Sequence, residues 1–446
     1  MKQKILYIYC LLGLFLPSCK DKTDTTVTTS SETEVTKFYF SSQDSFPSIG
    51  NATFTISHYS TSDTGLITNP DSMTYLTPVD RLVPHLLFKA TPASAVIVKP
   101  DTTFALTGTD TLDFTYPVLL RVTSSDLTAI KYYRIVVNVH QVDPDLFLWT
   151  RLTASVLGDG SASTRALRYG NTFYLFANDG FKNTVYRSAD GKSWDSGTSL
   201  VGLPDNCHVR EIIAGNDAFY YCQQGEVYTS ADALTWTSED LSGQTVVPQV
   251  TLMHFNDSVW LVGKHSTAGT FHLLVKDNDT WRAFTDTLPH NWPMTDFAAI
   301  EFVTSSLRHR AMIVGGYDTQ GNGLNSRWNI EYTPANGYRF ANFAIERPLC
   351  SAILGAAVVH YGDMFYLFGG VDAEAQYVTQ TALYSVDEGL NWLPIDTAHN
   401  QLMHVYSART QTSALTHDNC IYLFGGQTRT EIFSDVLQGQ LTRIDW

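Results

Sequence analysis

Phe365-Tyr366-Leu367-Phe368-Gly369-Gly370 is a short apolar run that ends in a glycine pair. It recurs at residues 421–426, with a degenerate copy at residues 311–316 and a copy without glycines at residues 173–177. Each run predicts a buried strand that leaves through a turn where side chains do not fit. Recurrence at this spacing predicts an all-β repeat architecture.

A second phrase recurs beside the first, and it joins a tyrosine to an acidic turn and a tryptophan. It occupies residues 185–194, 227–236 and 383–392, and the tryptophan follows the tyrosine by eight positions in all three copies. The phrase resembles the Asp-box turn of sialidases and other propellers, although only the third copy has the full spacing. Because aspartates in turns bind nearby backbone, the acids of these turns are expected to be structural. These acids are Asp190, Asp232 and Asp387.

The two phrases together define a repeat of four strands, and an aromatic residue marks each outer strand. The markers are Trp149, Trp194, Trp236, Trp281, Phe340 and Trp392. Their spacings of 45, 42, 45, 59 and 52 residues suit propeller repeats of roughly 40–50 residues. We therefore expect a six-bladed β-propeller over residues 145–446. The chain stops before its last repeat can form an outer strand, so residues 149–153 are expected to supply it and close the ring.

The first 19 residues have the character of a processing signal. Lys2 and Lys4 precede an apolar run that is too short for a stable bilayer span. Leu16-Pro17-Ser18-Cys19 resembles a bacterial lipobox, and the resemblance implies cleavage before Cys19 and acylation of that residue. The alternative is an uncleaved signal anchor. Residues 20–35 are rich in Thr, Ser, Asp and Glu, which predicts a flexible tether.

The acidic residues that follow Cys19 resemble the export signal of surface lipoproteins in Bacteroidota. This resemblance implies a protein held to the outer membrane by its lipid, at the cell surface. Several acyl chains on one residue anchor a soluble domain firmly, whereas a single chain is marginal.

Residues 36–143 are expected to form a separate small β-domain. Residues 52–56 and 133–139 alternate with period two, and Tyr133, Ile135, Val137 and Val139 share one face. A polar turn joins a further strand, residues 118–122, to the second of these. This arrangement resembles the last hairpin of Ig-like or cadherin-like domains, which implies a β-sandwich.

Composition excludes some classes of partner. The formal net charge of −15 and the lack of a basic stripe argue against a nucleic-acid partner. Beyond the signal, Cys207, Cys222, Cys350 and Cys420 form no Cys-x-x-Cys pair, so we expect no structural zinc site. We expect buried free thiols, with disulfides as the alternative in an exported protein, and no cofactor.

The polar hairpins and Gly-Gly strands are similar to those of kelch or galactose-oxidase-type propellers. The order of lipobox, tether, sandwich and ring resembles an uncharacterised family of Bacteroidota lipoproteins, domain-of-unknown-function family 6242. This resemblance covers nearly the whole mature chain. It implies the fold and little about function, because propellers carry unrelated activities.

Arginine recurs near the start of the predicted first strands, and four guanidinium groups on one face would suit an anionic ligand. The alternative is that each arginine is a structural strut. Trp292 and Tyr317 are candidates to stack on sugar rings. The predicted function is a non-catalytic binding module for a glycan or a surface protein. The four arginines are Arg165, Arg210, Arg347 and Arg409, and further loop residues of this face are His208, Asp296, His404 and Asp372.

Enzymatic alternatives find less support in the residues. The Arg-Ile-Pro segment of sialidases is absent, and no spacing singles out the Tyr and His ligands of a copper oxidase. A kelch-type sugar mutarotase would use an acid beside an arginine, and Glu211 and Glu346 keep that alternative open. A structural scaffold is the third alternative. No residue is assigned a catalytic role.

Overall fold

The computed structural model describes residues 29–59, 64–143, 146–158, 162–277, 280–304, 306–335 and 337–442. The chain divides into two compact units, Met1–Val142 and Asp143–Trp446. The lipobox resemblance and Cys19 fall on residues 1–28, outside the described residues. In the described part of the chain, no helix is long and apolar enough to cross a membrane.

Within its described residues, the first unit contains two sheets and one short helix, α1 (Pro47–Asn51). The two-stranded sheet pairs β1 (Val35–Phe40) with β4 (Pro84–Phe88). The six-stranded sheet has, in order, β2 (Thr55–His58), β3 (Thr64–Thr68), β8 (Ile130–Val136), β7 (Val118–Thr123), β5 (Ser94–Val98) and β6 (Thr103–Ala105).

The core of the first unit follows from the period-two pattern. Tyr133 and Ile135 of β8 are both 0% exposed, and they share one core with Phe38 of β1 and Leu120 of β7. Strand β3 pairs with β8 in parallel. Because a parallel pair needs a crossover connection, this sheet is not built from hairpins alone, and no sequence pattern indicated the crossover.

The second unit contains six four-stranded sheets within its described residues. Five of them use four consecutive strands. These are β10 (Ser163–Tyr169), β11 (Thr172–Asn178), β12 (Asn183–Ser188), β13 (Thr198–Ser199); β14 (Ile213–Ala214), β15 (Phe219–Gln223), β16 (Glu226–Ser230), β17 (Thr237–Asp240); β18 (Val246–Phe255), β19 (Ser258–His265), β20 (Phe271–Asp277), β21 (Thr280–Ala283); β22 (Ala298–Val303), β23 (His309–Val314), β24 (Ser326–Thr333), β25 (Gly337–Ala344); and β26 (Leu354–Tyr361), β27 (Met364–Val371), β28 (Ala382–Ser385), β29 (Leu393–Pro394).

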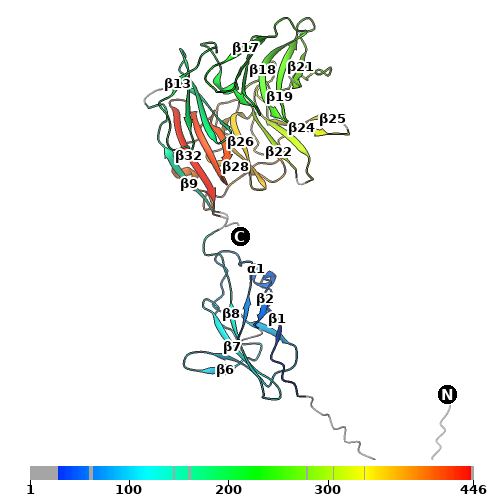
Figure 1. Cartoon of the computed structure of the whole chain (residues 1–446), viewed down its shortest axis with the longest axis vertical. Coiled ribbons are helices and arrows are strands. Elements are labelled where there is room, and N and C mark those ends of the chain that lie inside the picture. The colour runs from blue at the N-terminus through cyan, green and yellow to red at the C-terminus, as the bar shows by residue number, and fades with distance from the viewer. Residues whose placement is uncertain are drawn as a thin grey trace, which may run out of the picture. The chain divides into compact units, whose positions relative to one another are not determined.

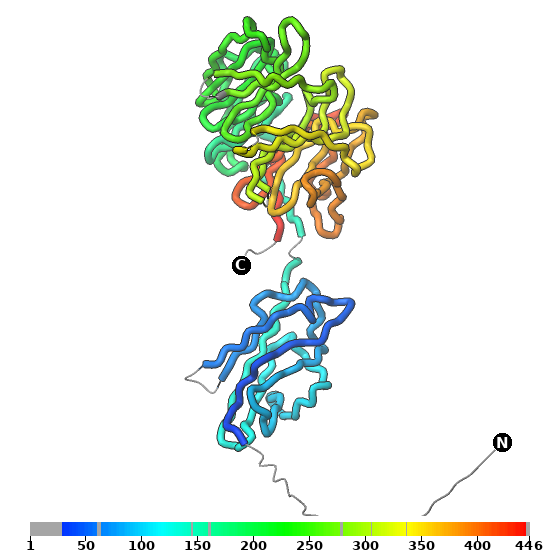
Figure 2. Tube along the Cα trace, turned by 90° about the vertical axis from the view of Figure 1, so that its right-hand side faces the viewer, coloured from blue at the N-terminus to red at the C-terminus, as the bar shows by residue number. Residues whose placement is uncertain are grey.

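The sixth sheet joins the two ends of the unit. It contains β30 (Ser413–His417), β31 (Cys420–Gln427), β32 (Ile432–Leu441) and β9 (Phe147–Thr153). Trp149 of β9 lies opposite Gly439 of β32, and a Cβ atom on Gly439 would come within 2.6 Å of the Trp149 ring. Figure 2 shows the beginning of this unit beside its red C-terminal strand.

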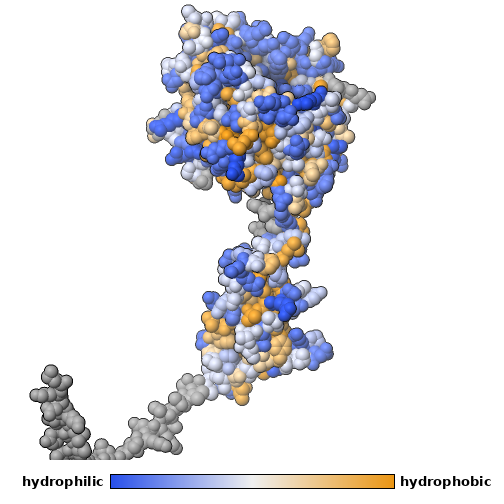
Figure 3. Space-filling view, turned by 180° about the vertical axis from the view of Figure 1, so that it is seen from behind, coloured by the Kyte–Doolittle hydropathy of each residue, from blue (hydrophilic) through white to orange (hydrophobic). Residues whose placement is uncertain are grey.

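The six sheets form a closed cycle. Each first strand contacts the first strand of the next sheet, from β10 through β14, β18, β22 and β26 to β30, and β30 contacts β10 (Figure 1). Apolar side chains fill the space between neighbouring sheets, as where Met312 and Val314 of β23 pack with Leu367 of β27 and Trp392. Hydrophilic residues cover much of the outer surface of this unit (Figure 3).

Glycine pairs connect consecutive sheets. Gly369 and Gly370 have φ of 65° and 84°, and the Gly370 N–H donates to the carbonyl of Arg409, 3.0 Å away, in the segment that precedes β30. A Cβ atom on Gly369 would clash with that carbonyl. We call the end of the sheets where first strands begin and second strands finish the Gly-Gly end.

The three Asp-box turns have the structural role expected of them. The Asp190 carboxylate accepts the N–H groups of Lys192 and Ser193 at 2.8 and 2.7 Å, and Asp232 binds its own turn in the same way. Asp387 accepts from the Asn391 N–H at 2.9 Å. Two short 3₁₀ helices complete the unit, η1 (Val209–Glu211) and η2 (Gln401–His404).

Candidate functional site

A cavity of about 590 Å³ lies among the first strands of the second unit. Its lining comes from β10, β14, β18, β22 and β30, from η1, and from the segments that precede β22 and β30. Four charged groups line it near the Gly-Gly end: Arg165, Arg210, Glu211 and Asp296.

Arg165 is the least satisfied of these groups. It lies on β10 opposite Phe176, and its Nε is buried without a hydrogen-bond partner. Among the described residues, its guanidinium group forms no hydrogen bond or ion pair. Burial alone lowers the pKa of Arg165 to about 10. A charged group taken from water without a partner is costly to the fold, so this arginine requires an explanation.

Arg165 also departs from the repeat. In three other sheets, a small buried residue pairs with the last residue before the glycines: Ala298 with Val314, Ala357 with Phe368, and Ser413 with Phe424. In the β10 sheet this register position holds Arg165, paired with Phe176. A long cation therefore stands where those three sheets place a methyl or hydroxymethyl group.

Arg210 lies next to Arg165. It belongs to η1, and its Nη1 donates to the carbonyls of Gln411 and Thr164, the latter at 3.4 Å. Burial, followed by the positive charge of Arg165, lowers the pKa of Arg210 to about 10, while Asp296 acts in the opposite direction. Its hydrogen-bond partners are backbone carbonyls, so its charge is stabilised by dipoles and not by a contacting carboxylate.

Two carboxyl groups, those of Glu211 and Asp296, line the same cavity. Burial, and then the nearby Asp296 carboxylate, raise the pKa of Glu211 to about 7. Asp296 has a φ of 51°, a conformation that non-glycine residues rarely adopt. Its Oδ1 accepts from Nε2 of Gln411 at 3.4 Å, and its carbonyl accepts from the Gly355 N–H at 2.8 Å. These contacts hold its strained backbone.

Three residues with positive φ are joined by backbone hydrogen bonds along the Gly-Gly end. Asp296, Gly355 and Gln411 each precede or begin a first strand and have φ of 51°, 65° and 61°. The Gln411 N–H donates to Gly355 and the Gly355 N–H donates to Asp296, at 2.7 and 2.8 Å. The Gln411 carbonyl then accepts from Arg210. Backbone geometry therefore fixes one cation and one carboxylate of the site relative to each other.

The rest of the lining is partly apolar. Met253 of β18, Met294 and Phe297 contribute to it, and Thr251 Oγ1 is buried there without a hydrogen-bond partner. At the other end of the first strands, Arg168 donates to Asn171 at 3.3 Å, and Glu301 lies 3.9 Å from His254 Nδ1. Arg168 therefore has a partner for one nitrogen, although its Nε is buried without one, whereas Arg165 has no partner for any of its nitrogens among the described residues.

Arg409 is a structural residue, and the expectation that it faces a ligand is wrong. Its side chain is 1% exposed, and Nη1 lies 2.7 Å from the Asp435 carboxylate. The guanidinium also stacks on Phe433 and Tyr406, 3.8 and 4.7 Å from the ring centroids. All of this lies within the sixth sheet and the segment before it.

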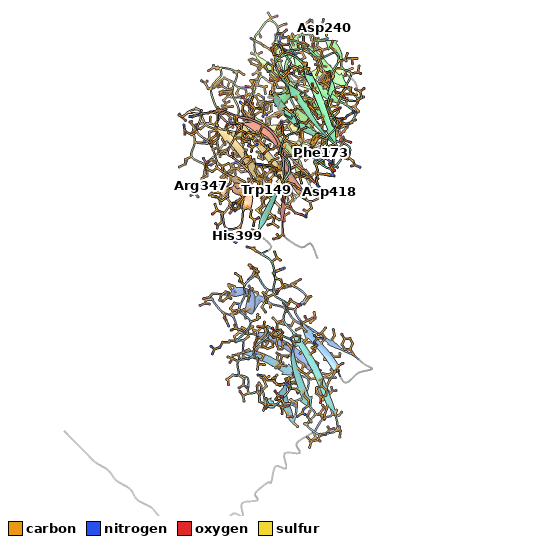
Figure 4. All side chains as sticks on the ribbon, turned by 90° about the vertical axis from the view of Figure 1, so that its left-hand side faces the viewer. Trp149, Phe173, Asp240, Arg347, His399 and Asp418 are labelled. Carbon is orange, nitrogen blue, oxygen red and sulfur yellow. The ribbon has the colours of Figure 1, made fainter. Side chains whose placement is uncertain are left out.

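Three other sequence candidates also lie outside the cavity lining. Arg347 is exposed at the periphery of the second unit (Figure 4), and its carbonyl accepts from the Trp392 N–H. Trp292 is 0% exposed and packs on Trp328, so a sugar cannot stack on it. Tyr317 is half-buried, and its N–H donates to Thr295 beside the cavity. Of the four arginines that were expected to face one ligand, only Arg165 and Arg210 line the cavity.

Of the additional loop residues, His208 and Asp296 line the cavity, whereas His404 and Asp372 do not. Cys207, Cys222 and Cys420 are buried free thiols, and Cys350 is a half-buried one. Within the described ranges, no cluster of three or more His, Cys, Asp or Glu side chains is arranged to hold a metal ion.

Comparison with known proteins gives the family. Residues 143–446 match the model described as the DUF6242 beta propeller domain, and residues 19–137 match the DUF6242 N-terminal domain of unknown function. No curated protein matches the chain. A solved structure described as "Structure of YjhT" covers 65% of this chain and 96% of its own, with 12% identity and a TM-score of 0.43, too weak a likeness to carry an argument. The chain belongs to the DUF6242 family, and its second unit is a β-propeller domain of unknown function.

Proposed function

We propose that the propeller domain is a non-catalytic binding module whose central cavity holds an anionic group between Arg165 and Arg210. The observation that carries this proposal is the Arg165 guanidinium, which lines the cavity, has a buried Nε, and has no partner among the described residues. Buried polar groups in folded proteins are normally paired, and an exception often marks a place that a ligand completes.

The chemistry of the pair supports an anion. A guanidinium group offers several N–H donors in a rigid plane that matches carboxylate and sulfate oxygens. In a site where burial lowers the pKa of both arginines to about 10, an anion restores the Coulombic and hydrogen-bond energy that the cations lost on leaving water. Electrostatic attraction is also stronger in such a site than at an exposed surface.

We further propose the setting that the sequence indicates. Acylated Cys19 anchors the protein to the outer membrane at the cell surface, an Ig-like first unit acts as a spacer, and the six sheets are the six blades of one ring. In this setting the ligand is an acidic group of a glycan, because a cavity of about 590 Å³ admits a sugar residue but not a folded protein surface.

Calorimetric titration with fragments of acidic glycans tests the proposal. We expect binding by the wild-type protein and by Arg347→Ala, a matched control that removes an exposed arginine outside the cavity lining. Arg165→Ala is expected to weaken binding by at least about tenfold, which corresponds to one lost charge-assisted hydrogen bond. Unchanged binding by Arg165→Ala would move the site elsewhere, and conversion of the fragment to a new product would show an enzyme.

A further inference from the structure

We infer that the ligand is a hydroxylated monocarboxylate of the sugar-acid class, with its carboxylate on Arg165 and Arg210 and its hydroxyl groups donating to Glu211 and Asp296. This inference rests on the proposed function, because it assigns the same cavity a narrower chemical class of ligand. It starts from the neighbours of the two cations.

The two carboxyl groups discriminate between anions. Sulfate presents only hydrogen-bond acceptors, so its remaining oxygens would meet Asp296, and Glu211 whenever it is ionised, as like charges. A hydroxyl group is a donor and satisfies a carboxylate. A ligand that carries both a carboxylate and hydroxyl groups can therefore satisfy both halves of the lining, whereas sulfate satisfies one half and is repelled by the other.

The charge balance favours a monoanion. Two cations and two acids line this end of the cavity, and the pKa of Glu211 is raised to about 7. Near neutral pH these four groups therefore carry a summed charge between zero and one positive unit. A single carboxylate complements that charge, and a dianion exceeds it.

The remaining surface suits a sugar ring. Met253, Met294 and Phe297 give one part of the lining an apolar character, and the C–H groups of a sugar ring can pack against such a surface. The unpaired hydroxyl group of Thr251 is a further hydrogen-bonding group in the lining. The volume of about 590 Å³ lies within the range of roughly 300–1,000 Å³ of small-molecule sites.

Four probes test the inference on the wild-type protein at neutral pH by calorimetry. D-glucuronate has a carboxylate and hydroxyl groups, cyclohexanecarboxylate has the carboxylate on a similar ring without hydroxyl groups, D-glucose has no charge, and sulfate has charge without donors. We expect D-glucuronate to bind at least about tenfold more tightly than each of the other three.

Variants identify the groups that discriminate. Asp296→Asn keeps a residue type that tolerates positive φ, and Glu211→Ala removes the second carboxyl group. Each is expected to reduce the preference for D-glucuronate over cyclohexanecarboxylate to below about threefold, by loss of a hydrogen bond to a charged group. Arg165→Ala is expected to weaken both carboxylates equally. Circular dichroism identifies any variant that fails to fold. In that case the relative affinities of the four probes for the wild-type protein test the inference by themselves.

The outcomes separate the two proposals. Equal affinity for D-glucuronate and cyclohexanecarboxylate, or tightest binding of sulfate, would overturn the sugar-acid assignment and leave the anion site intact. Retention of the D-glucuronate preference by both Asp296→Asn and Glu211→Ala would also overturn it. Binding of none of the three anions would overturn the proposed function, and the narrower assignment with it.

Discussion

Arg165 and Arg409 belong to one domain and have opposite environments. Arg409 is 1% exposed, is paired with Asp435 at 2.7 Å, and stacks between Phe433 and Tyr406. The Arg165 guanidinium has no partner among the described residues, although burial lowers its pKa to about 10. A buried cation with a complete set of partners stabilises the fold, whereas one without partners is available to a ligand.

The sheets themselves explain this difference. Asp435 lies on β32, one residue before Val436, which pairs with Phe424. In the β10 sheet, Val185 pairs with Phe176 in the same way, and the residue before Val185 is Thr184. The carboxylate that holds Arg409 therefore has no counterpart on β12. The two arginines also occupy different register positions, since Ser413, and not Arg409, corresponds to Arg165.

The largest expected effect is that of Arg409→Ala. Removing this side chain leaves the buried Asp435 carboxylate, which is 3% exposed, with only the longer ion pair to Arg151 Nε at 3.8 Å. The free energy of unfolding should fall by about 3–5 kcal/mol, measured by urea denaturation. Arg347→Ala is the exposed control and should change it by less than about 0.5 kcal/mol. A loss below about 1 kcal/mol for Arg409→Ala would contradict its role as a strut.

Glu211 should make stability depend on pH. Burial raises its pKa from the ordinary 4.5 to about 7 in the folded protein. The folded state therefore binds more protons than the unfolded chain between these pH values, and stability falls as pH rises through them. From about pH 5 to about pH 8, the wild type should lose on the order of 2 kcal/mol relative to Glu211→Gln.

The control for this titration is Glu346→Gln, which changes an exposed glutamate that also adjoins an arginine. It should follow the wild-type pH profile. Parallel profiles for the wild type and Glu211→Gln in urea denaturation would show that Glu211 titrates as an ordinary surface carboxyl.

Arg165→Met should have the opposite sign to Arg409→Ala. Methionine keeps an unbranched side chain and removes a desolvated charge, so the free protein should gain about 1 kcal/mol in the free energy of unfolding. Thermal and urea denaturation without ligand measure this gain. Destabilisation by more than about 1 kcal/mol would mean that Arg165 supports the fold and would remove its contrast with Arg409.

Much of the fold could be predicted because the repeat is written in short-range patterns. The apolar runs before the glycines appear as β23, β27 and β31, and the Asp-box acids bind their own turns. Trp149 lies on β9, the strand that pairs with β32. These features depend on residues that are close in sequence, or on a strand pairing that recurs in each repeat.

The site could be predicted only in part, because pairing depends on residues far apart in the chain. Arginine near a strand start does not reveal whether a carboxylate lies opposite, and Asp435 is 26 residues from Arg409. Trp292 was expected to stack on a sugar ring, yet it is buried and packs on Trp328. Positive φ at Asp296 and Gln411 has no strong sequence signal. Aligning the β10, β22, β26 and β30 sheets by register distinguishes Arg165 from Ala298, Ala357 and Ser413.

The central claim is that Arg165 is held without a protein partner so that it can bind an anion. A crystal structure of the protein grown with D-glucuronate, and a second grown with sulfate, test it most directly. We predict that at least one anion places an oxygen about 2.7–2.9 Å from the guanidinium nitrogens of Arg165 and also contacts Arg210. A cavity in which neither anion lies at Arg165, while both are bound elsewhere or not at all, would contradict the claim.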